Sequence, residues 1–202
     1  METIGIILAR GGSKRLPKKN IKMLKDKPMI YYTIHEALKS DLDHIIVSSD
    51  DENILAISRR IGADTIKRPP ELARDDTPSY DALKHALFET ESKMNKIYDT
   101  IVLLQPTSPF RRYTMINRSL RIDADAVVSV ERCSFDKFVL NGAIFTLRRE
   151  IFTQLKESSQ YLIDDLIGLN LNIVALVTSR CIDIDTIDDF IEAEKMMIDE
   201  VD

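Results

Sequence analysis

The amino-acid sequence predicts an α/β protein, a Rossmann-like three-layer sandwich in which a mainly parallel, twisted sheet lies between two layers of helices. Short apolar runs rich in β-branched residues alternate with amphipathic stretches of helical period through the first two-thirds of the chain. Strands separated by helices require crossover connections, and such crossovers give parallel sheets covered on both faces. No repeat, low-complexity tract or linker interrupts the pattern, so we expect residues 1–202 to form a single domain.

The first elements have clear signals. A strand is expected at residues 3–9, because the continuous apolar run TIGIILA is typical of a strand buried on both faces. A helix is expected at 29–40, after a proline that a first helical turn tolerates. A second buried strand, at 43–50, precedes a helix at 51–62 that begins with acidic residues and ends in glycine, as the helix macrodipole and a C-cap favour.

The alternation continues, less regularly beyond residue 138. A helix is expected at 77–92, with Thr77 as its N-cap and Pro78 at its first position. The other predicted elements are strands at 63–68, 99–105, 124–130, 139–147 and 172–177, a helix at 115–122, a short helix after residue 147, and a final helix from about Thr186.

Composition excludes several classes of function. The net charge of -5 argues against a general nucleic-acid binder. Cys133 and Cys181 are far apart and form no C-x-x-C pair, which excludes a cysteine-rich zinc site; we expect both to be small buried side chains in a reducing compartment. The apolar runs are too short for a signal peptide or a membrane span. A cytoplasmic protein without nucleic-acid or membrane partners is therefore expected.

A basic, glycine-containing loop follows the first strand, in the stretch IILARGGSKRLPKKN. Neither G-x-x-x-x-G-K-[ST] nor G-x-G-x-x-G is present, so a Walker loop and a dinucleotide fingerprint are unsupported. Gly11 and Gly12 are surrounded by the cations Arg10, Lys14, Arg15, Lys18 and Lys19. Open α/β sheets bind ligands beyond their strand ends, where backbone N–H groups approach phosphates closely. The loop is either a polyphosphate clamp or a solvated basic loop.

Paired carboxylates occur near the C-terminus, in CIDIDTIDDF. Asp183 and Asp185 are two residues apart, so in an extended segment both carboxylates project from one side, with isoleucines facing the core. Neighbouring carboxylates repel each other unless a cation is near, and a hard divalent metal is the usual partner. In the alternative interpretation, Asp185 or Thr186 caps the last helix and the following aspartates lie in its first turn.

Polar residues also end the strand in LLQPTSPFR, where two prolines stiffen the turn. Such groups on a rigid strand end suit a polyhydroxylated ligand. The residues concerned are Gln105, Thr107, Ser108 and Arg111. An ordinary polar turn is the alternative.

Six motifs, in order along nearly the whole chain, resemble the CMP-sialic acid synthetase (acylneuraminate cytidylyltransferase) family. They are LARGGSKRLPKKN, VSSDDENI, RPPELARDDTPS, LLQPTSPFR, NGAIF and IDIDTIDDF. Each motif alone is modest, and together they are highly specific. The resemblance implies a sheet like that of nucleotide-diphospho-sugar transferases. It also implies an enzyme that joins CMP from CTP to a nine-carbon 2-keto sugar acid, releases pyrophosphate and requires Mg²⁺.

The resemblance implies roles for individual residues. Arg10 and Lys19 are expected on the triphosphate and, with Asp185, as catalytic residues; Asn20 is expected at the ribose. The expected nucleotide-binding residues are Leu8, Ala9, Arg10, Gly11, Gly12, Ser13, Lys14, Arg15, Lys19, Asn20, Arg68 and Ser79. The expected sugar-binding residues are Gln105, Thr107, Ser108, Arg111 and Asn141. The expected metal ligands are Asp183 and Asp185.

The implied reaction is an in-line attack of the sugar's anomeric hydroxyl on the α-phosphorus of CTP. Mg²⁺, Arg10 and Lys19 then offset the charge that develops on the phosphate oxygens. Deprotonation of the hydroxyl by a carboxylate near the metal and deprotonation through metal coordination remain alternatives.

One departure from the family concerns assembly. Family members usually carry a long extra segment between the strand AVVSV and the motif NGAIF. This segment forms a dimerisation arm that brings basic residues into the neighbouring subunit's sugar site. Here only residues 131–138 separate the two motifs, so the homodimer and the sugar pocket lack the usual arm. Arg111, Arg132 and Lys137 are candidate substitutes.

Three functions stay open on the sequence. The first is a cytidylyltransferase for a sialic-acid-like sugar acid, such as a legionaminate or pseudaminate relative. The second is a nucleotidyltransferase acting on another sugar acid or on a phosphorylated acceptor. The third is a non-catalytic nucleotide-binding paralogue. The presence of Arg10, Lys19, Asp183 and Asp185 together favours an active enzyme.

Overall fold

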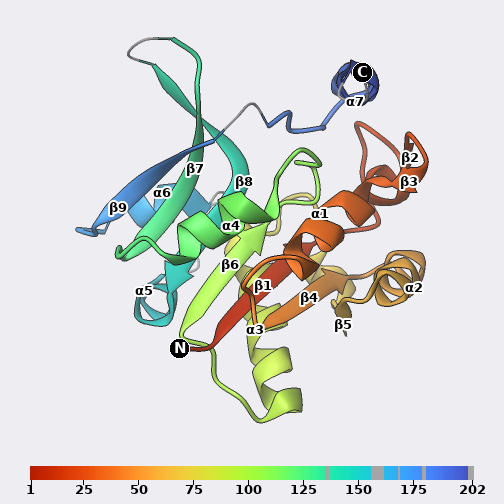
Figure 1. The fold of residues 1–202 in the computed structure, drawn as a ribbon. Coiled ribbons are helices and arrows are strands. Elements are labelled where there is room, and N and C mark those ends of the chain that lie inside the picture. Colours follow the sequence, from red (N-terminus) through yellow and green to blue (C-terminus); the bar gives the residue numbers. More distant parts are fainter. Residues whose placement is uncertain (135–136, 156–161, 168, 179–180, 200–202) are drawn as a thin grey trace.

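The computed structural model describes residues 1–134, 137–155, 162–167, 169–178 and 181–199. A seven-stranded sheet is made of β1 (Thr3–Leu8), β4 (His44–Ser49), β5 (Asp64–Lys67), β6 (Thr100–Leu104), β7 (Ala126–Arg132), β8 (Phe138–Arg148) and β9 (Ile173–Thr178). The strand order is β5-β4-β1-β6-β8-β7-β9 (Figure 1). Neighbouring strands are parallel except at β8, which pairs antiparallel with β6 and with β7. The mainly parallel sheet that the sequence predicts is confirmed.

Helices cover both faces of this sheet, which gives the expected three layers. One face packs against α1 (Met29–Leu38), α2 (Glu52–Ile61) and α4 (Tyr113–Leu120). The other face packs against α3 (Ser79–Met94), α5 (Arg149–Gln154) and α6 (Leu162–Ile167). No described helix is long and apolar enough to cross a membrane.

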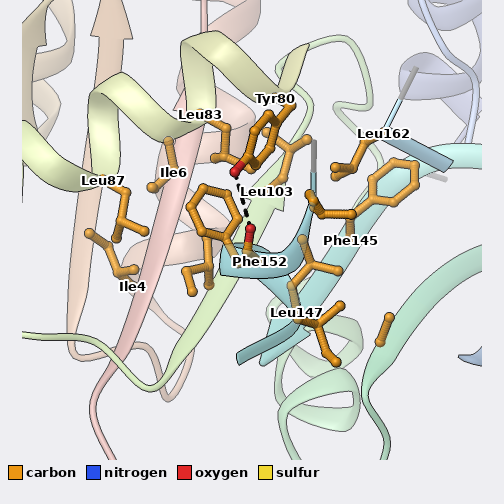
Figure 2. Packing of buried hydrophobic residues seen from close by; sticks show 14 of the residues in the cluster. Ile4, Ile6, Tyr80, Leu83, Leu87, Leu103, Phe145, Leu147, Phe152 and Leu162 are labelled. Carbon is orange, nitrogen blue, oxygen red and sulfur yellow. Dashed lines mark hydrogen bonds between the residues drawn. The ribbon is translucent and has the colours of Figure 1, made fainter. Parts of the chain in front are cut away.

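The central strand β1 shows why its run of apolar residues is continuous. Alternate side chains of a strand point to opposite faces of the sheet. Ile4 and Ile6 therefore belong to the apolar cluster under α3, whereas Ile7 belongs to the cluster under α1. Figure 2 shows Ile4 and Ile6 beside Leu83 and Leu87 of α3. Because each buried aliphatic side chain contributes about 1.5–3 kcal/mol, burial on both faces fixes β1 at the centre of the sheet.

A hydrogen bond within the same apolar layer joins two elements that are distant in the sequence. The hydroxyl of Tyr80, in the first turn of α3, donates a hydrogen bond of 3.2 Å to the carbonyl of Phe152 in α5 (Figure 2). The two rings also pack with centroids 5.1 Å apart. A buried tyrosine hydroxyl needs such a partner, so the contact fixes where α3 begins relative to the end of the sheet.

The start of α3 differs from the prediction. The helix begins at Ser79, with Pro78 in the N-cap position and no side-chain cap, while the hydroxyl of Thr77 donates to the carbonyl of Glu71. Thr77 is therefore not the N-cap, because its hydroxyl is engaged in the preceding loop. By contrast, Asp51 is the N-cap of α2. Its side chain accepts hydrogen bonds from the amides of Asn53 and Ile54.

Several short elements were not anticipated, among them a hairpin and two 3₁₀ turns, η1 (Lys19–Ile21) and η2 (Pro70–Leu72). The strands β2 (Met23–Leu24) and β3 (Lys27–Pro28) form an antiparallel hairpin after the basic loop, which itself ends in η1. The final helix α7 (Ile187–Asp199) lies apart from the sheet and against this hairpin (Figure 1). The hairpin and α7 thus bring the C-terminal helix beside the segment that follows the basic loop.

A direct connection joins β7 to β8, where a longer segment is usual in the family that the sequence resembles. Arg132 pairs with Phe138 at the end of the ladder, and the amide of Cys133 donates to the carbonyl of Lys137 at 2.9 Å. This end of the two strands extends beyond the sheet (Figure 1). Cys133 is exposed there rather than buried, which corrects the expectation for that residue, while Cys181 is buried as expected.

Candidate active site

A cleft of about 440 Å³ opens at the carboxyl ends of β1, β5 and β6. Leu8 is the last residue of β1, Arg68 directly follows β5, and Gln105 directly follows β6. Ligand sites of open α/β sheets lie at this edge, because the loops after the strands converge there. The cleft is therefore where the sheet topology predicts a ligand.

The predicted nucleotide-binding residues divide into two groups. Those that line the cleft are Leu8, Arg10, Ser13, Lys14, Arg15, Lys19, Asn20, Arg68 and Ser79. Ala9, Gly11 and Gly12 do not line it. Their backbone explains this for two of them, since the amide of Ala9 donates to the carbonyl of Ser48 and the amide of Gly11 to the carboxylate of Asp50.

Asp75 reaches the basic loop from the connection between β5 and α3. Its carboxylate accepts from Arg10 Nη2 at 2.6 Å and also pairs with Lys14 Nζ. The hydrogen bond from Lys14 and the positive charge of Arg10 lower the pKa of Asp75, so it is ionised at neutral pH. Two cations of the loop thus share one carboxylate from across the cleft.

Asp185 neutralises two further cations from the other side. Its Oδ1 accepts from Lys19 Nζ and its Oδ2 from Arg15 Nη2, each at 2.6 Å. The Lys19 side chain is 14% exposed, so this pair is the more enclosed of the two. Charge-assisted bonds of this length are strong, and Asp185 consequently holds the end of the basic loop close to the segment before α7.

The segment that carries Asp185 is fixed by its own hydrogen bonds. The amide of Ile184 donates to the carbonyl of Thr107 at 2.8 Å, and the Ile184 side chain is fully buried. Asp189 Oδ2 accepts from the amides of Asp185 and Thr186, and the amide of Asp189 donates to Thr186 Oγ1. This reciprocal arrangement is a capping box. Thr186 therefore caps α7, and Asp185 is left available to the cleft.

Asp183 lies on the same segment but does not line the cleft. The residue as a whole is exposed, yet protein atoms crowd its carboxylate. This burial is the main cause of a raised pKa, and the negative charge of Asp185 adds to it, while a hydrogen bond from Thr107 and the charge of Lys19 oppose it. The two carboxylates are thus close enough to interact, as the spacing in the sequence predicts.

These two carboxylates fit a hard divalent cation in one respect. A cation relieves both the repulsion and the burial that raise the pKa of Asp183. Within the described residues, no group of three or more His, Cys, Asp or Glu side chains is placed to hold a metal. A magnesium ion here therefore needs further oxygen ligands from a bound phosphate or water, as is common for this ion.

Arg68 forms part of the back wall of the cleft. It is 4% exposed, and its Nε and Nη2 donate to Oγ and the carbonyl of Ser48 at 3.1 and 2.7 Å. Burial lowers its pKa to about 10, a fall that the charge of Asp50 opposes. At neutral pH Arg68 is therefore a fixed positive charge whose position is set by β4.

Asn20 presents an unused acceptor at the same wall. Its Nδ2 donates to the carbonyl of Arg10 at 2.9 Å, which ties η1 to the start of the basic loop. Its Oδ1 is buried and has no hydrogen-bond partner among the described residues. Since a buried acceptor without a partner costs free energy, this oxygen is suited to a ligand hydroxyl or amine.

Helix α3 begins beside the cleft with Ser79 and Ala82 in its wall. Because Pro78 supplies no side-chain cap, the positive end of the helix dipole is not offset there by a capping side chain. A helix N-terminus of this kind favours an anion or a polar ligand.

The predicted sugar-binding residues also divide. Gln105 and Thr107 line the cleft, whereas Ser108, Arg111 and Asn141 do not. Arg111 is 1% exposed, and its guanidinium donates to the carbonyls of Ala143 and Gln105 and to Thr33 Oγ1. Burial lowers its pKa to about 10. In this structure Arg111 is thus a buried crosslink between α1, β8 and the end of β6, and its expected role as a sugar contact stays a prediction.

Asn141 and Ser108 are also enclosed within the fold, and their expected roles as sugar contacts stay predictions. Asn141 is 8% exposed; its Oδ1 accepts from Ser129 Oγ at 2.6 Å and its Nδ2 donates to Thr178 Oγ1 at 2.8 Å. These bonds join β7, β8 and β9. Ser108 is fully buried, and its hydroxyl has no partner within the described part of the chain. Neither residue reaches the cleft.

Several lining residues were not predicted. They are Leu72, Arg74, Asp75, Thr77, Ala82 and Pro106. Most belong to the connection between β5 and α3, within the motif RPPELARDDTPS. Their signal was the position of this connection after a strand of a parallel sheet, since such loops meet at the carboxyl edge.

Comparison with known proteins adds to this geometry. The model of the cytidylyltransferase family matches residues 4–161. Among curated proteins, the chain is 44% identical over 135 residues to N-acylneuraminate cytidylyltransferase of Escherichia coli O18:K1:H7, a match that covers 64% of this chain and 31% of that protein. It is 37% identical over 139 residues to CMP-N,N'-diacetyllegionaminic acid synthase of Legionella pneumophila, covering 66% of this chain and 60% of that protein. The chain thus spans less than two-thirds of the length of these relatives.

A solved structure extends the likeness of fold to nearly the whole chain. The structure of a CMP:2-keto-3-deoxy-manno-octonic acid synthetase complexed with CTP superimposes with a TM-score of 0.81 and covers 99% of this chain and 100% of that one. The two sequences are 19% identical, so the comparison supports the fold alone.

Proposed function

Because the chain belongs to the cytidylyltransferase family, as a relative of CMP-sialic acid synthetases, we propose that it transfers CMP from CTP to a sialic-acid-like 2-keto sugar acid and releases pyrophosphate. The observation that carries the proposal is the concentration of positive charge in the cleft. Six cations line it, Arg10, Lys14, Arg15, Lys19, Arg68 and Arg74, in a chain whose net charge is -5. A polyanion such as a nucleoside triphosphate is the ligand that this field attracts.

The bond changes balance without an oxidant or a further reactant. The anomeric hydroxyl oxygen forms a bond to the α-phosphorus, the bond from that phosphorus to the bridging oxygen of pyrophosphate breaks, and the hydroxyl proton is released. Charge builds on the phosphate oxygens as pyrophosphate leaves. Arg10 and Lys19 are held at the cleft wall and offset this charge, while Lys14 and Arg15 lie nearby on the same loop.

Other residues hold the two substrates in line. The unpartnered Oδ1 of Asn20, the fixed charge of Arg68 and the start of α3 at Ser79 form the nucleoside side of the cleft. Gln105 and Thr107, at the end of β6, form the side assigned to the sugar acid. Because reacting groups held in one geometry react far faster than free ones, this positioning supplies much of the catalysis.

Asp183 and Asp185 are the residues that would hold a divalent cation, together with phosphate oxygens. When bound there, Mg²⁺ supplies positive charge that polarises the α-phosphate and stabilises the leaving pyrophosphate. Asp185 is also paired with Arg15 and Lys19, so these two cations would compete with a metal ion for its carboxylate.

We further propose that residues 1–202 act as one domain in a reducing, cytoplasmic compartment. Cys133 is an exposed thiol without a disulfide partner in the described part of the chain, and such thiols persist where disulfides are kept reduced. The short β7–β8 connection means that any homodimer forms without the family's usual arm.

Pyrophosphate release tests the proposal. Each of CTP, UTP, ATP and GTP is combined with nine-carbon and eight-carbon keto sugar acids in the presence of MgCl₂. We expect release with CTP and a nine-carbon acid. Turnover only with an eight-carbon acid would assign a different sugar acid as the acceptor. CTP binding without any turnover would indicate either an acceptor of another class or a non-catalytic paralogue.

A matched pair of variants tests the metal site within that assay. Asp185→Asn should lower turnover about a hundredfold or more, since it removes a ligand of the metal ion that would stabilise charge on the transferred phosphate. Asp188→Asn removes the same charge from an exposed position in the first turn of α7 and should leave turnover within about twofold. An unchanged rate for Asp185→Asn would contradict the metal assignment.

A further inference from the structure

Asp75 is the carboxylate of the cleft that the proposed reaction does not use. It belongs to the connection between β5 and α3, and it crosses the cleft to pair with Arg10 and Lys14 of the basic loop. Asp185, on the opposite side, has an assigned role as a metal ligand, whereas nothing in the proposed chemistry requires a carboxylate at Asp75. Its position therefore calls for a separate explanation.

Asp75 is paired with the cations that a bound phosphate would need. Carboxylate and phosphate oxygens bind arginine and lysine in the same way, through short charge-assisted hydrogen bonds. Arg10 donates to Asp75 through Nη2, so a triphosphate that accepts from the same nitrogen competes with the carboxylate. The Asp75 side chain is 39% exposed and needs no buried rearrangement to move into water.

The ion pairs also position the segment that carries Asp75. The internal bonds of residues 69–78 are local, such as the amide of Leu72 donating to the carbonyl of Pro69 and the hydroxyl of Thr77 donating to the carbonyl of Glu71. The bonds of Asp75 to Arg10 and Lys14 tie this segment to the basic loop. Leu72, Arg74 and Thr77 of the same segment line the cleft. The tie therefore holds one wall of the cleft against the other.

We propose that Asp75 is a built-in competitor of the nucleotide's polyphosphate, which lowers the affinity of the free cleft for that polyphosphate. In the free protein it neutralises Arg10 and Lys14 and holds residues 69–78 across the cleft. A polyphosphate displaces it, and the segment is then released from its tie to the basic loop. The inference rests on the proposed function, because it assumes that the basic loop binds phosphates. Ligands without a polyphosphate do not displace Asp75, so they gain nothing from its removal.

Binding of inorganic tripolyphosphate and of cytidine, measured by titration calorimetry at low salt without divalent ions, tests the inference. Asp75→Asn should tighten tripolyphosphate binding about three- to tenfold, the scale of one or two exposed ion pairs, and leave cytidine unchanged. Asp76→Asn is the matched control: Asp76 is exposed and makes no ion pair with the described residues, so this variant should change either affinity less than about twofold.

Amide hydrogen exchange supplies an independent measurement. Tripolyphosphate should speed exchange in residues 69–78 of the unaltered protein, and Asp75→Asn should show the faster exchange before any ligand is added. The inference is overturned if Asp75→Asn binds tripolyphosphate no more tightly than the unaltered protein, or if Asp76→Asn gives the same gain. If the unaltered protein binds neither tripolyphosphate nor CTP, the proposed function itself fails.

Discussion

At the start of the basic loop, Gly11 passes close to helix α2. A Cβ added to Gly11 would lie 2.8 Å from the Cβ of Asp51 and 3.0 Å from its Oδ2. Asp51 is the N-cap of α2, so it is not free to move aside without loss of the cap. Gly12, by contrast, has nothing within 4 Å of an added Cβ. The first glycine thus allows the loop to pack against α2, and the second is not required by packing.

This difference predicts opposite outcomes for two similar substitutions. Gly11→Ala should lower the free energy of unfolding by about 1–3 kcal/mol, because it overpacks the loop and disturbs the Asp51 cap. Gly12→Ala should change it by less than about 0.5 kcal/mol. Urea unfolding of both variants is the measurement. Equal stabilities for the two variants would contradict the packing account of Gly11.

Single residues also show what the sequence could not reveal. The position of the basic loop at the ligand-binding edge was predictable, because positive charges next to a buried strand of a parallel sheet are seldom needed to stabilise the fold. The partner of Arg10 was not, since Asp75 meets it only after the chain has crossed the sheet. The surroundings of Arg111 could not be predicted either, because an arginine after a strand end has the same sequence pattern whether it faces a ligand or, as here, donates to three acceptors within the fold.

Among the elements, α7 has the most direct bearing on the site. Its apolar face packs against residues that flank the basic loop, in a cluster that contains Leu16, Leu24, Met29 and Phe190. The Lys22 ammonium lies 5.1 Å from the centre of the Phe190 ring, and Lys25 Nζ donates to the carbonyl of Met197 at 2.6 Å. A lysine at the C-terminal end of a helix also complements its dipole. The helix therefore anchors the segment that presents Asp185.

Loss of this packing should loosen α7 before the rest of the fold. Phe190 is 4% exposed, and Phe190→Ala should cost about 3 kcal/mol of local stability and lower turnover, because Asp185 is no longer held in place. Ile191 is 43% exposed on the same helix, and Ile191→Ala should cost less than about 1 kcal/mol. Hydrogen exchange of the α7 amides is the measurement. Equally fast exchange in the two variants would count against the anchoring role.

The helices and strands themselves were largely predictable, because their hydrophobic periods are clear. The pairing of β8 was not, since the apolar run VLNGAIFTL has no feature that specifies direction; the short β7–β8 connection reverses the chain and makes β8 antiparallel. The N-cap of α3 was misplaced by one residue, because Thr77 and Pro78 carry the signal of a helix start while the hydroxyl of Thr77 donates to the carbonyl of Glu71.

For the whole molecule, the decisive property is the distribution of charge. The chain carries a net charge of -5, yet six cations and two carboxylates line the cleft at the carboxyl edge of the sheet. Opposite charges on the rest of the surface do not cancel this local field, because salt screens exposed charges beyond about 10 Å at moderate ionic strength. The fold therefore concentrates attraction for anions at one place.

The affinity of the protein for CTP, CDP, CMP and cytidine, measured by titration calorimetry with MgCl₂, tests this account most directly. If the cleft is a polyphosphate site, the affinity should fall with each phosphate removed, with a total loss of about a hundredfold or more between CTP and cytidine. If cytidine binds as tightly as CTP, or if no nucleotide binds, the assignment of the cleft as a nucleoside triphosphate site is contradicted.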